Sequence, residues 1–481
     1  IRGLKCPKAL YFNKHQQGLR DDLSAQQEAI FSQGTKVGEL AQGLFPGGVD
    51  CTPEKLWNLQ ESVMQTKIAI EQGSTVIYEA AFQFEKVLIL LDVLVKDEEG
   101  WKAYEVKSST SVHDIYINDA TIQSYVIRGS GLDLIDVSIV HINNQYVFEG
   151  ELDIHALFSK VSVKEQVDKL LPMVPKQVKS MKEILAGDKV PEVEIGPQCG
   201  SPYPCDFMGH CWSHVPEYSV FDIRYGRGIG WELYNEGILT TTDIPDDYPL
   251  NHRHQIQVSG DKYGEKIIDQ VQIKNFLNGL ECPLAHIDFE TFQIAVPNLP
   301  GTRPYQQICF QWSAHIQQEH NGPVEHREYL GIQGEDPREE FVISLIEAMR
   351  GVKTILVYNI GFERGRLNDL AIQFPKYAEP IRSIIERLGD LMIPFQKRYI
   401  YLPEMRGSYS IKVVLPALLP ELSYKDLNIQ EGGTASSIYA NLHLVESKAE
   451  IEQIRKDLLA YCELDTYAMV KILEKLEEIA V

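Results

Sequence analysis

The chain has 481 residues and a mass of 54.6 kDa, a length that predicts two or three domains rather than one small module. Hydrophobic residues make up 44% and charged residues 24%, which is ordinary globular usage and excludes a largely disordered chain. The formal net charge of -22 excludes non-specific coating of DNA or RNA as the main binding mode. Any nucleic acid has to bind a local patch of the surface.

The amino-terminal half alternates helix-like and strand-like patterns. Helices are predicted at 7–14 and 163–185, and strands at 75–84, 87–96, 101–108 and 135–142. The longest apolar stretch, at 87–95, is broken by Asp92 and is far shorter than the roughly 20 residues of a membrane span. Because the first residues also show no signal-peptide pattern, we expect a cytoplasmic protein that does not bind membranes.

The carboxy-terminal half begins after a stretch at 219–279 that is typical of a connector with some helix. Strands are then predicted at 284–292, 307–314 and 354–358, and helices at 338–349, 363–374 and 448–479. Strands interleaved with helices in both halves predict two α/β domains, at 1–218 and 280–481.

A predicted β-hairpin carries the first group of charged residues. Asp92 lies inside an apolar strand, and the next strand reads Tyr104-Glu-Val-Lys107. Because strand side chains alternate, Glu105 and Lys107 project to one face, which Asp92 on the neighbouring strand can join. Two carboxylates and a lysine can hold a divalent cation and activate an attacking water, as phosphodiester hydrolysis requires. The alternative is a solvated edge hairpin, which the apolar residues around Asp92 disfavour.

This hairpin resembles the PD-(D/E)XK nucleases, specifically the RecB-like branch that includes the CRISPR-associated nucleases. The matching residues are Glu79, Asp92, the run Glu-Val-Lys at 105–107, and a following helix with Gln123 and Tyr125. The resemblance implies a catalytic group containing Glu79, with Asp92 and Glu105 as metal ligands. It also implies Lys107 as water activator or charge stabiliser and Gln123 as a supporting contact. The chain departs from the family at Gly38, which stands where the family has a metal-binding histidine.

Four cysteines form a second group. Cys199, Cys205 and Cys211 are separated by five residues each in a segment rich in Pro and Gly, and a fourth lies at Cys6. Ligation by four cysteines suits a 4Fe–4S cluster or zinc, and the spacing lacks the CxxC knuckles of structural zinc sites. The histidines at 210 and 214 are alternative zinc ligands, and three unrelated buried thiols are the plainer alternative.

The placement of these cysteines resembles the iron-sulfur subset of the RecB-like nucleases, with one cysteine before the nuclease core and three after it. The chain thus resembles that branch through two independent sets of residues. The resemblance implies a structural cluster that ties Cys6 to the far end of the domain and closes a very long loop.

A third group is acidic and lies in the second half. Asp288 and Glu290 share one face of a predicted strand, a geometry suited to binding metal ions. A second strand runs into Glu363 at a helix start, and Tyr461 and Asp465 lie one turn apart on the last helix.

The order of these residues resembles the DEDD exonucleases of the RNase H-like fold, in their tyrosine-bearing variety. The resemblance implies that Asp288, Glu290, Glu363 and Asp465 bind two Mg²⁺ or Mn²⁺ ions and that Tyr461 orients or activates the attacking water. The family normally has Asp at the position of Glu363, so Asp390 and Asp369 are alternative ligands. The basic and aromatic candidates for nucleic-acid contacts are Arg364, Arg366, Lys397, Tyr399, Arg398, Tyr401, Tyr409 and Lys412.

Together, the two resemblances point to a prokaryotic family that fuses an iron-sulfur PD-(D/E)XK domain to a DEDD exonuclease-like domain. We expect a metal-dependent nuclease that acts on DNA in preference to RNA, with 3′–5′ exonuclease character in its second domain, in DNA repair or defence against foreign DNA. Two alternatives remain: a nucleic-acid-binding or assembly subunit with one vestigial nuclease site, and an RNA exonuclease. A redox enzyme is disfavoured because no GxGxxG fingerprint follows any predicted strand.

Overall fold

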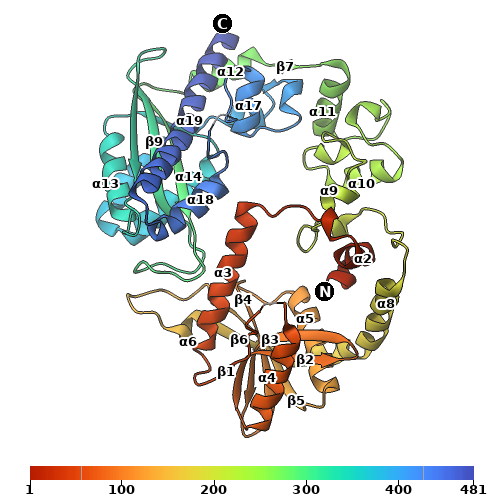
Figure 1. Cartoon of the computed structure of the whole chain (residues 1–481). Coiled ribbons are helices and arrows are strands. Elements are labelled where there is room, and N and C mark those ends of the chain that lie inside the picture. Colours follow the sequence, from red (N-terminus) through yellow and green to blue (C-terminus); the bar gives the residue numbers. More distant parts are fainter. Residues whose placement is uncertain (56, 426) are drawn as a thin grey trace. The chain divides into compact units, whose positions relative to one another are not determined.

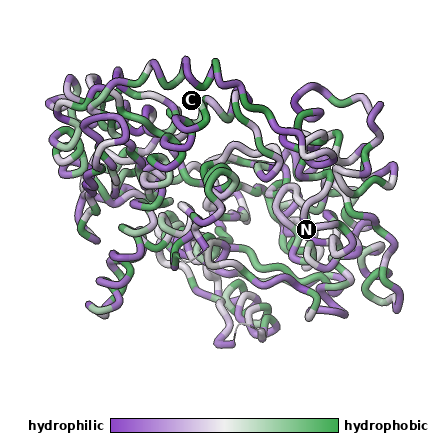
Figure 2. Tube along the Cα trace, turned by 90° about the horizontal axis from the view of Figure 1, so that it is seen from above, coloured by the Kyte–Doolittle hydropathy of each residue, from purple (hydrophilic) through white to green (hydrophobic). Residues whose placement is uncertain are grey.

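The computed structural model describes residues 1–55, 57–425 and 427–481. The chain is a mixed α/β protein with two mixed sheets, and it divides into two compact units (Figure 1). Unit 1 comprises Ile1–His214 and Ile294–Gln306, and unit 2 comprises Val215–Gln293 and Gln307–Val481. Over these described ranges no helix is both long and apolar enough to cross a membrane, and hydrophobic and hydrophilic residues are interspersed along the trace in Figure 2.

Unit 1 is built on a six-stranded sheet with the strand order β1-β2-β3-β4-β5-β6. Its strands are β1 (Val49–Asp50), β2 (Val76–Phe84), β3 (Val87–Lys96), β4 (Trp101–Lys107), β5 (Leu134–Ile142) and β6 (Phe158–Ser162). The pairs β1–β2 and β4–β5 are parallel, and the other neighbours are antiparallel. The four strands predicted between residues 75 and 142 are β2 to β5, whereas the short β1 and the polar β6 carry no clear strand pattern.

Helices pack against both faces of this sheet. The helices of unit 1 are α1 (Arg2–Lys5), α2 (Pro7–His15), α3 (Ala25–Gln42), α4 (Leu59–Glu71), α5 (Asp114–Gly129), α6 (Ile154–Leu157), α7 (Lys164–Leu170), α8 (Val174–Ala186) and α9 (Met208–Cys211). Helices α4, α5 and α7 share one core cluster with β2 to β5, and α3 contributes to a second cluster. The predicted helix at 163–185 is divided into α7 and α8 by a 3₁₀ turn at Leu171–Met173, because proline has no N–H to continue the helical ladder.

The sheet of unit 2 has five strands in the order β10-β9-β8-β11-β12. They are β8 (Leu284–Phe292), β9 (Ile308–Gln317), β10 (Val324–Leu330), β11 (Thr354–Val357) and β12 (Leu388–Asp390). Strands β8, β9 and β10 form an antiparallel meander, and β11 and β12 run parallel to β8. The predicted strand at 284–292 has the bounds of β8, and those at 307–314 and 354–358 correspond to β9 and β11.

The helices of unit 2 are α10 (Arg227–Asn235), α11 (His252–Tyr263), α12 (Gln270–Leu277), α13 (Arg338–Ala348), α14 (Ile360–Gln373), α15 (Ala378–Glu386), α16 (Ile393–Gln396), α17 (Ile411–Leu418), α18 (Gly432–Asn441) and α19 (Lys448–Ala480).

The two faces of this second sheet differ in polarity. Helices α13, α14 and α15 bury an apolar core with odd-numbered β8 residues such as Ile287. The long helix α19 lies against the other face (Figure 1), where the side chain of Gln311 donates to the Leu458 carbonyl at 2.8 Å.

The segment predicted to be a connector, at 219–279, lies within unit 2. It folds into α10, α11 and α12, and a small cluster including Val220, Leu233 and Val258 forms its core. The Gln257 side chain links this segment to a later part of the chain. Its Nε2 atom donates to the Asp222 carbonyl within the segment at 3.1 Å and to the Arg406 carbonyl outside it at 3.3 Å. A further two-stranded sheet pairs β7 (Ile267–Ile268) with β13 (Ile400–Tyr401).

Candidate functional site

Three carboxylates converge on the polar face of the unit 2 sheet. Asp288 and Glu290 project from the same side of β8, as alternation requires, and Asp465 comes from α19. One carboxylate oxygen from each lies within 4.8 Å of the others. Glu290 and Asp465 are buried and Asp288 is partly exposed, so the group opens toward solvent at one side.

This carboxylate triad of Asp288, Glu290 and Asp465 is poorly compensated electrostatically. Burial and the neighbouring charge of Asp465 raise the pKa of Glu290 to about 8. Burial raises the pKa of Asp465 to about 6, although a hydrogen bond from Tyr424 opposes the rise. The pKa of Asp288 is well above its ordinary value for the same reason, burial, followed by repulsion from Asp465. Buried like charges at this separation suit a bound cation of charge two or more.

A lysine and two tyrosines line the triad. Tyr424 Oη donates to Asp465 Oδ1 at 2.7 Å, and Lys412 Nζ donates to Tyr461 Oη at 3.2 Å. Gly432 begins α18 against the same group, and a Cβ at this position would lie 3.6 Å from Glu290 Oε2. The Cys462 thiol also donates to Asp288 Oδ2 at 3.7 Å. The groups around the carboxylates are therefore hydroxyls, an ammonium group, a thiol and close backbone.

Glu363 lies in the first turn of α14 and is almost completely buried. Its Oε2 atom has no hydrogen-bond partner among the described residues, and burial raises its pKa to about 8. Asp390 instead accepts hydrogen bonds from the backbone amides of Asn359 at 3.1 Å and Ile360 at 3.2 Å. Asp369 is ion-paired to Arg366 at 2.8 Å. Of the three alternatives for a fourth ligand, Glu363 is the one with a buried carboxylate oxygen, Oε2, that has no hydrogen-bond partner among the described residues.

The hairpin residues of unit 1 also come together, where β3 and β4 part. Backbone pairing between these strands ends at Val93 and Tyr104. Two residues after Tyr104, the Val106 amide donates to Asp92 Oδ2 at 2.5 Å. The carboxylate of Asp92 thus takes the place of a backbone acceptor, which explains why an acidic residue is tolerated inside this buried strand.

Each oxygen of Glu105 has a protein partner. Lys107 Nζ donates to Oε1 at 2.6 Å, and Gln123 Nε2, from α5, donates to Oε2 at 2.7 Å. Lys107 also donates to Asp119 Oδ2 at 3.1 Å. Burial and the nearby Asp92 raise the pKa of Glu105 to about 8, and burial raises that of Asp92 to about 6. Burial tends to lower the pKa of Lys107, but its two carboxylate partners hold it above the ordinary value.

The remaining residues of the hairpin motif lie at different places. Glu79 stands in β2 opposite Asp92, in the left-handed backbone region with a φ of 50°, and burial raises its pKa. Tyr125 is directed away from the carboxylates, because its ring packs edge-on against Phe84 with centroids 5.4 Å apart. Gly38 lies within α3 and offers no side chain to this group.

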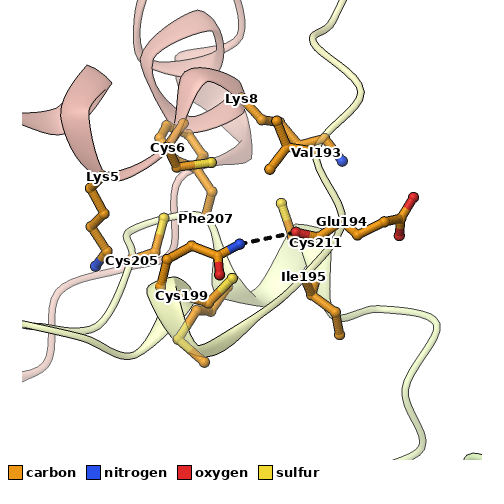
Figure 3. A pocket seen from close by; sticks show the side chains of 13 residues that line it. Lys5, Cys6, Lys8, Val193, Glu194, Ile195, Cys199, Cys205, Phe207 and Cys211 are labelled. Atoms are coloured by element: carbon orange, nitrogen blue, oxygen red, sulfur yellow. Dashed lines mark hydrogen bonds between the residues drawn. The ribbon is translucent and has the colours of Figure 1, made fainter. Parts of the chain in front are cut away.

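All four predicted cluster cysteines line one cavity of unit 1. Cys6, at the start of α2, and Cys199, Cys205 and Cys211 surround a small hollow that is partly open to solvent (Figure 3). All four are free thiols, and Lys5 and Lys8 stand at the same hollow. Burial raises the pKa of Cys205, and the Lys5 ammonium opposes the rise, so positive charge is available to stabilise thiolates.

The two alternative zinc ligands do not line this hollow. The ring of His210 packs edge-on against Phe12, with centroids 5.2 Å apart. Glu194 and Gln198 also line the hollow. Its four thiols form a donor set that suits iron-sulfur clusters and zinc equally well in its chemistry.

The predicted nucleic-acid contacts of unit 2 separate into exposed and buried residues. Tyr401 is fully buried, with its hydroxyl accepting from the Gly407 amide at 3.3 Å, whereas Arg364 and Lys397 are exposed. Arg398 and Tyr409 belong to a group that we name the arginine–tyrosine patch. Its members are Arg224, Tyr225, Arg253, Arg398 and Tyr409.

Stacked side chains hold this patch together. The guanidinium of Arg224 lies 5.0 Å from the ring centre of Tyr225 and 4.9 Å from that of Tyr409, and the two hydroxyls are 2.5 Å apart. Burial lowers the pKa of Arg398, and the charges of Arg253 and Arg224 add to that effect. Over the ranges that the structure describes, these three arginines make no ion pair with a carboxylate. The patch is thus a concentration of uncompensated positive charge on an acidic protein.

The sequence patterns do not predict several residues that the structure places at these sites. Asp119 lies one helical turn before Gln123, a spacing that could have indicated a shared face. Tyr424 and Gly432 carry no such signal, because they follow a stretch without regular pattern and reach Asp465 and Glu290 only through the tertiary fold.

Comparison with known proteins relates parts of the chain to a family of unknown function and to uncharacterized proteins. Residues 285–410 match the family described as "Domain of unknown function (DUF2779)". An uncharacterized protein of Mycoplasma genitalium is 25% identical over 222 residues, which cover 42% of this chain and 33% of that protein. An uncharacterized protein of Ureaplasma parvum is 27% identical over 219 residues, covering 40% of this chain and 31% of that protein. The matched part thus spans about a third of the length of these curated relatives.

Proposed function

We propose that the chain is a metal-dependent nuclease that hydrolyses phosphodiester bonds of DNA, exonucleolytically on single strands or ends. The observation that carries this proposal is the buried carboxylate triad of unit 2 beside Tyr461 and Lys412. An all-oxygen, uncompensated donor set fits Mg²⁺ or Mn²⁺. Its biological setting would be DNA repair or defence against foreign DNA.

In this proposal the ions are held by Asp288, Glu290, Asp465 and the free Oε2 atom of Glu363. When bound, two such ions stabilise the attacking and leaving oxygens of the phosphodiester. Lys412 holds the Tyr461 hydroxyl in place, and Tyr461 orients the attacking water. Tyr424 fixes the rotamer of Asp465 through its hydrogen bond, which keeps that carboxylate aimed at the metal position.

We also propose a specific fold for each of the two units. An antiparallel meander followed by two strands parallel to its first strand, with α19 on the polar face, supports an RNase H-like DEDD exonuclease domain in unit 2. The parted hairpin with Asp92, Glu105, Lys107 and the α5 glutamine supports a PD-(D/E)XK nuclease domain in unit 1. The hollow lined by four thiols fits a structural 4Fe–4S cluster.

The arginine–tyrosine patch supports a nucleic acid as the substrate. Tyr225 is 66% exposed and can stack on a base, while the three arginines can bind backbone phosphates. Tyr409 of the patch lies three residues before Lys412 in the sequence, and the Lys412 ammonium contacts Tyr461 beside the triad.

A specific observation also favours a narrower function, in which the unit 1 site is vestigial and that unit serves for binding or assembly. Lys107 already occupies the position of a counterion between Glu105 and Asp119, so the carboxylates there have protein partners without any metal. The choice of DNA over RNA rests on the RecB-like resemblance, and an RNA exonuclease is the alternative.

The proposal is tested with Asp288→Asn and Lys107→Ala, assayed separately with Mn²⁺ on end-labelled single- and double-stranded DNA and on RNA. We expect Asp288→Asn to reduce release of mononucleotides by about 1000-fold, since a metal-based step contributes several kcal/mol. Glu446→Gln, at an exposed loop position, is the matched control and should retain full activity. If only one of the two variants loses cleavage activity, hydrolysis is assigned to the unit that carries that substitution. Unchanged cleavage by both variants would show the catalytic assignment to be wrong.

A further inference from the structure

A row of three histidines crosses the same polar face of the unit 2 sheet. His286 of β8 pairs with His315 of β9, and His315 pairs with His326 of β10. Directly opposite residues of neighbouring strands project to the same side, so the row lies under α19. The rings of His315 and His326 are stacked, with centroids 4.6 Å apart.

A carboxylate of α19 completes a compact group with two of these histidines. One ring nitrogen each of His315 and His326 and one carboxylate oxygen of Glu463 lie within 4.8 Å of one another. The Glu463 Oε1 atom is 3.7 Å from His326 Nδ1. This distance is longer than a hydrogen bond and close to the roughly 3.4 Å that separates two donors bound to one tetrahedral Zn²⁺ at about 2.0–2.1 Å.

The hydrogen bonds behind the histidines determine which ring nitrogens are protonated. Thr466 Oγ1 has two backbone acceptors, the Glu463 carbonyl at 3.0 Å and the Cys462 carbonyl at 3.5 Å, and donates its single proton to the nearer one. It must therefore accept from its two side-chain partners, the Ser313 hydroxyl at 2.8 Å and His315 Nδ1 at 2.8 Å. Because Ser313 spends its proton on Thr466, it must accept from His326 Nε2 at 3.0 Å.

The hydrogen bonds from Thr466 to the Glu463 carbonyl, from Ser313 and His315 to Thr466, and from His326 to Ser313 can form together in one way only. His315 then carries its proton on Nδ1, and His326 carries its proton on Nε2. The lone pairs of His315 Nε2 and His326 Nδ1 are then available. Metal-binding histidines in proteins have this arrangement, with the second ring nitrogen donating to an oxygen that fixes the tautomer.

We propose that His315, His326 and Glu463 form a second metal site that binds Zn²⁺, distinct from the carboxylate triad. Two imidazoles and one carboxylate are a donor set that zinc prefers, whereas Mg²⁺ prefers oxygen alone. The side chains of His326 and Glu463 are 25% and 50% exposed, so the ion can enter from solvent and keep water as a fourth ligand. This proposal does not depend on the nuclease activity.

The site would fasten the turn of α19 that bears part of the triad. Glu463 and Thr466 flank Asp465 on that helix, and β9 and β10 supply the histidines. A zinc ion here would pin α19 to the meander and thereby hold Asp465 and Tyr461 in register with Asp288. Zinc would then act as a structural ion that supports the neighbouring site without taking part in hydrolysis.

The test is zinc binding by the full chain. Protein dialysed against a chelator is equilibrated with micromolar Zn²⁺, and bound zinc is measured by mass spectrometry for the wild type and His326→Ala. We expect the variant to bind one equivalent less. His320→Ala is the matched control, because His320 is an exposed histidine of the same unit whose partner is Glu477. It should bind as much zinc as the wild type. In the Asp288→Asn and Cys205→Ser backgrounds, adding His326→Ala should again remove one equivalent of zinc, which separates this site from the carboxylate triad and from the cysteines.

Two further measurements keep the inference falsifiable if a variant is poorly folded. Glu463→Gln, at a half-exposed position, should weaken zinc binding by on the order of 10- to 100-fold. With Co²⁺, the wild-type minus His326→Ala difference spectrum should show visible absorption without a sulfur-to-cobalt band. Equal zinc content in wild type and His326→Ala, or a sulfur-to-cobalt band in that difference spectrum, would overturn the proposal.

Discussion

The two carboxylate groups of this protein use similar residues, yet they differ in how their charges are compensated. In unit 1 both oxygens of Glu105 accept hydrogen bonds, from Lys107 and Gln123, and Asp92 accepts one from the backbone. In unit 2, over the described ranges, no side chain donates to Glu290, and Glu363 Oε2 has no partner. The first group has an internal counterion, whereas the second leaves its charges for an external one.

This difference indicates how an acidic site can be stable before its metal arrives. A lysine at hydrogen-bonding distance offsets the cost of burying a carboxylate, but it also competes with a metal for the same oxygens. The unit 2 triad keeps its nearest lysine on Tyr461, so the carboxylates remain available. We therefore expect unit 2 to depend on metal more strongly than unit 1, and the following experiments test that contrast.

The largest effect should be the pH dependence of stability without metal. Because the pKa of Glu290 is raised to about 8 and that of Asp465 to about 6, the folded state retains protons that the unfolded state releases above about pH 4. Metal-free protein should therefore lose stability as the pH rises from about 4 to about 8. Thermal unfolding at pH 5.5 and pH 8 should show Mn²⁺ raising the melting temperature more at pH 8. An equal Mn²⁺ effect at both values would contradict this.

The next largest effect should come from removing the internal counterion of unit 1. Lys107→Ala leaves the buried Glu105 with Gln123 as its main partner, and we expect a loss of about 3 kcal/mol in the free energy of unfolding. Urea unfolding monitored by circular dichroism measures it. Lys102→Ala is the control on the same strand, because its partners Asp97 and Glu99 are on the surface. If the two variants are equally stable, the ion pair of Lys107 is not a stabilising element.

A smaller effect of opposite sign is expected in unit 2. Glu290→Gln relieves repulsion within the triad and should stabilise the metal-free protein at pH 8 by on the order of 1 kcal/mol, while abolishing most of the stabilisation by Mn²⁺. Urea unfolding with EDTA and with Mn²⁺ measures both. Glu446→Gln should change neither. Destabilisation of the metal-free protein by Glu290→Gln would remove the contrast between the two units.

The smallest effect concerns the arginine–tyrosine patch. Arg224→Ala should weaken binding of single-stranded DNA a few-fold and reduce the slope of log affinity against log salt by roughly 0.7, the value for one phosphate contact on a single strand. Fluorescence anisotropy with Ca²⁺ in place of Mn²⁺ measures binding without cleavage. Arg382→Ala, at an ion pair with Glu379 outside the patch, is the control. An unchanged salt slope would exclude a phosphate contact at Arg224.

Much of the fold could be predicted because it follows local patterns. The strands at 87–96 and 284–292 have the predicted bounds, since a buried strand needs a continuous apolar run bordered by turn residues. The helix predicted at 363–374 begins three residues earlier, at Ile360, because Asp390 from a distant strand accepts the first amides of that helix. The short or polar strands β6, β10 and β12 are ordered by pairing with neighbours rather than by their own pattern.

The sequence by itself determined which residues share a face within one element: Asp288 with Glu290, Glu105 with Lys107, and Tyr461 with Asp465. These pairs follow from the repeats of strand and helix, which are local properties of the backbone. The resemblance to the DEDD exonucleases predicted that Asp465 meets Asp288, and the structure brings the two together. Only the tertiary structure decided that Tyr424 fixes Asp465 and that Glu463 meets His315 and His326. Those meetings join residues far apart in the chain through sheet register and helix packing, which no local periodicity records.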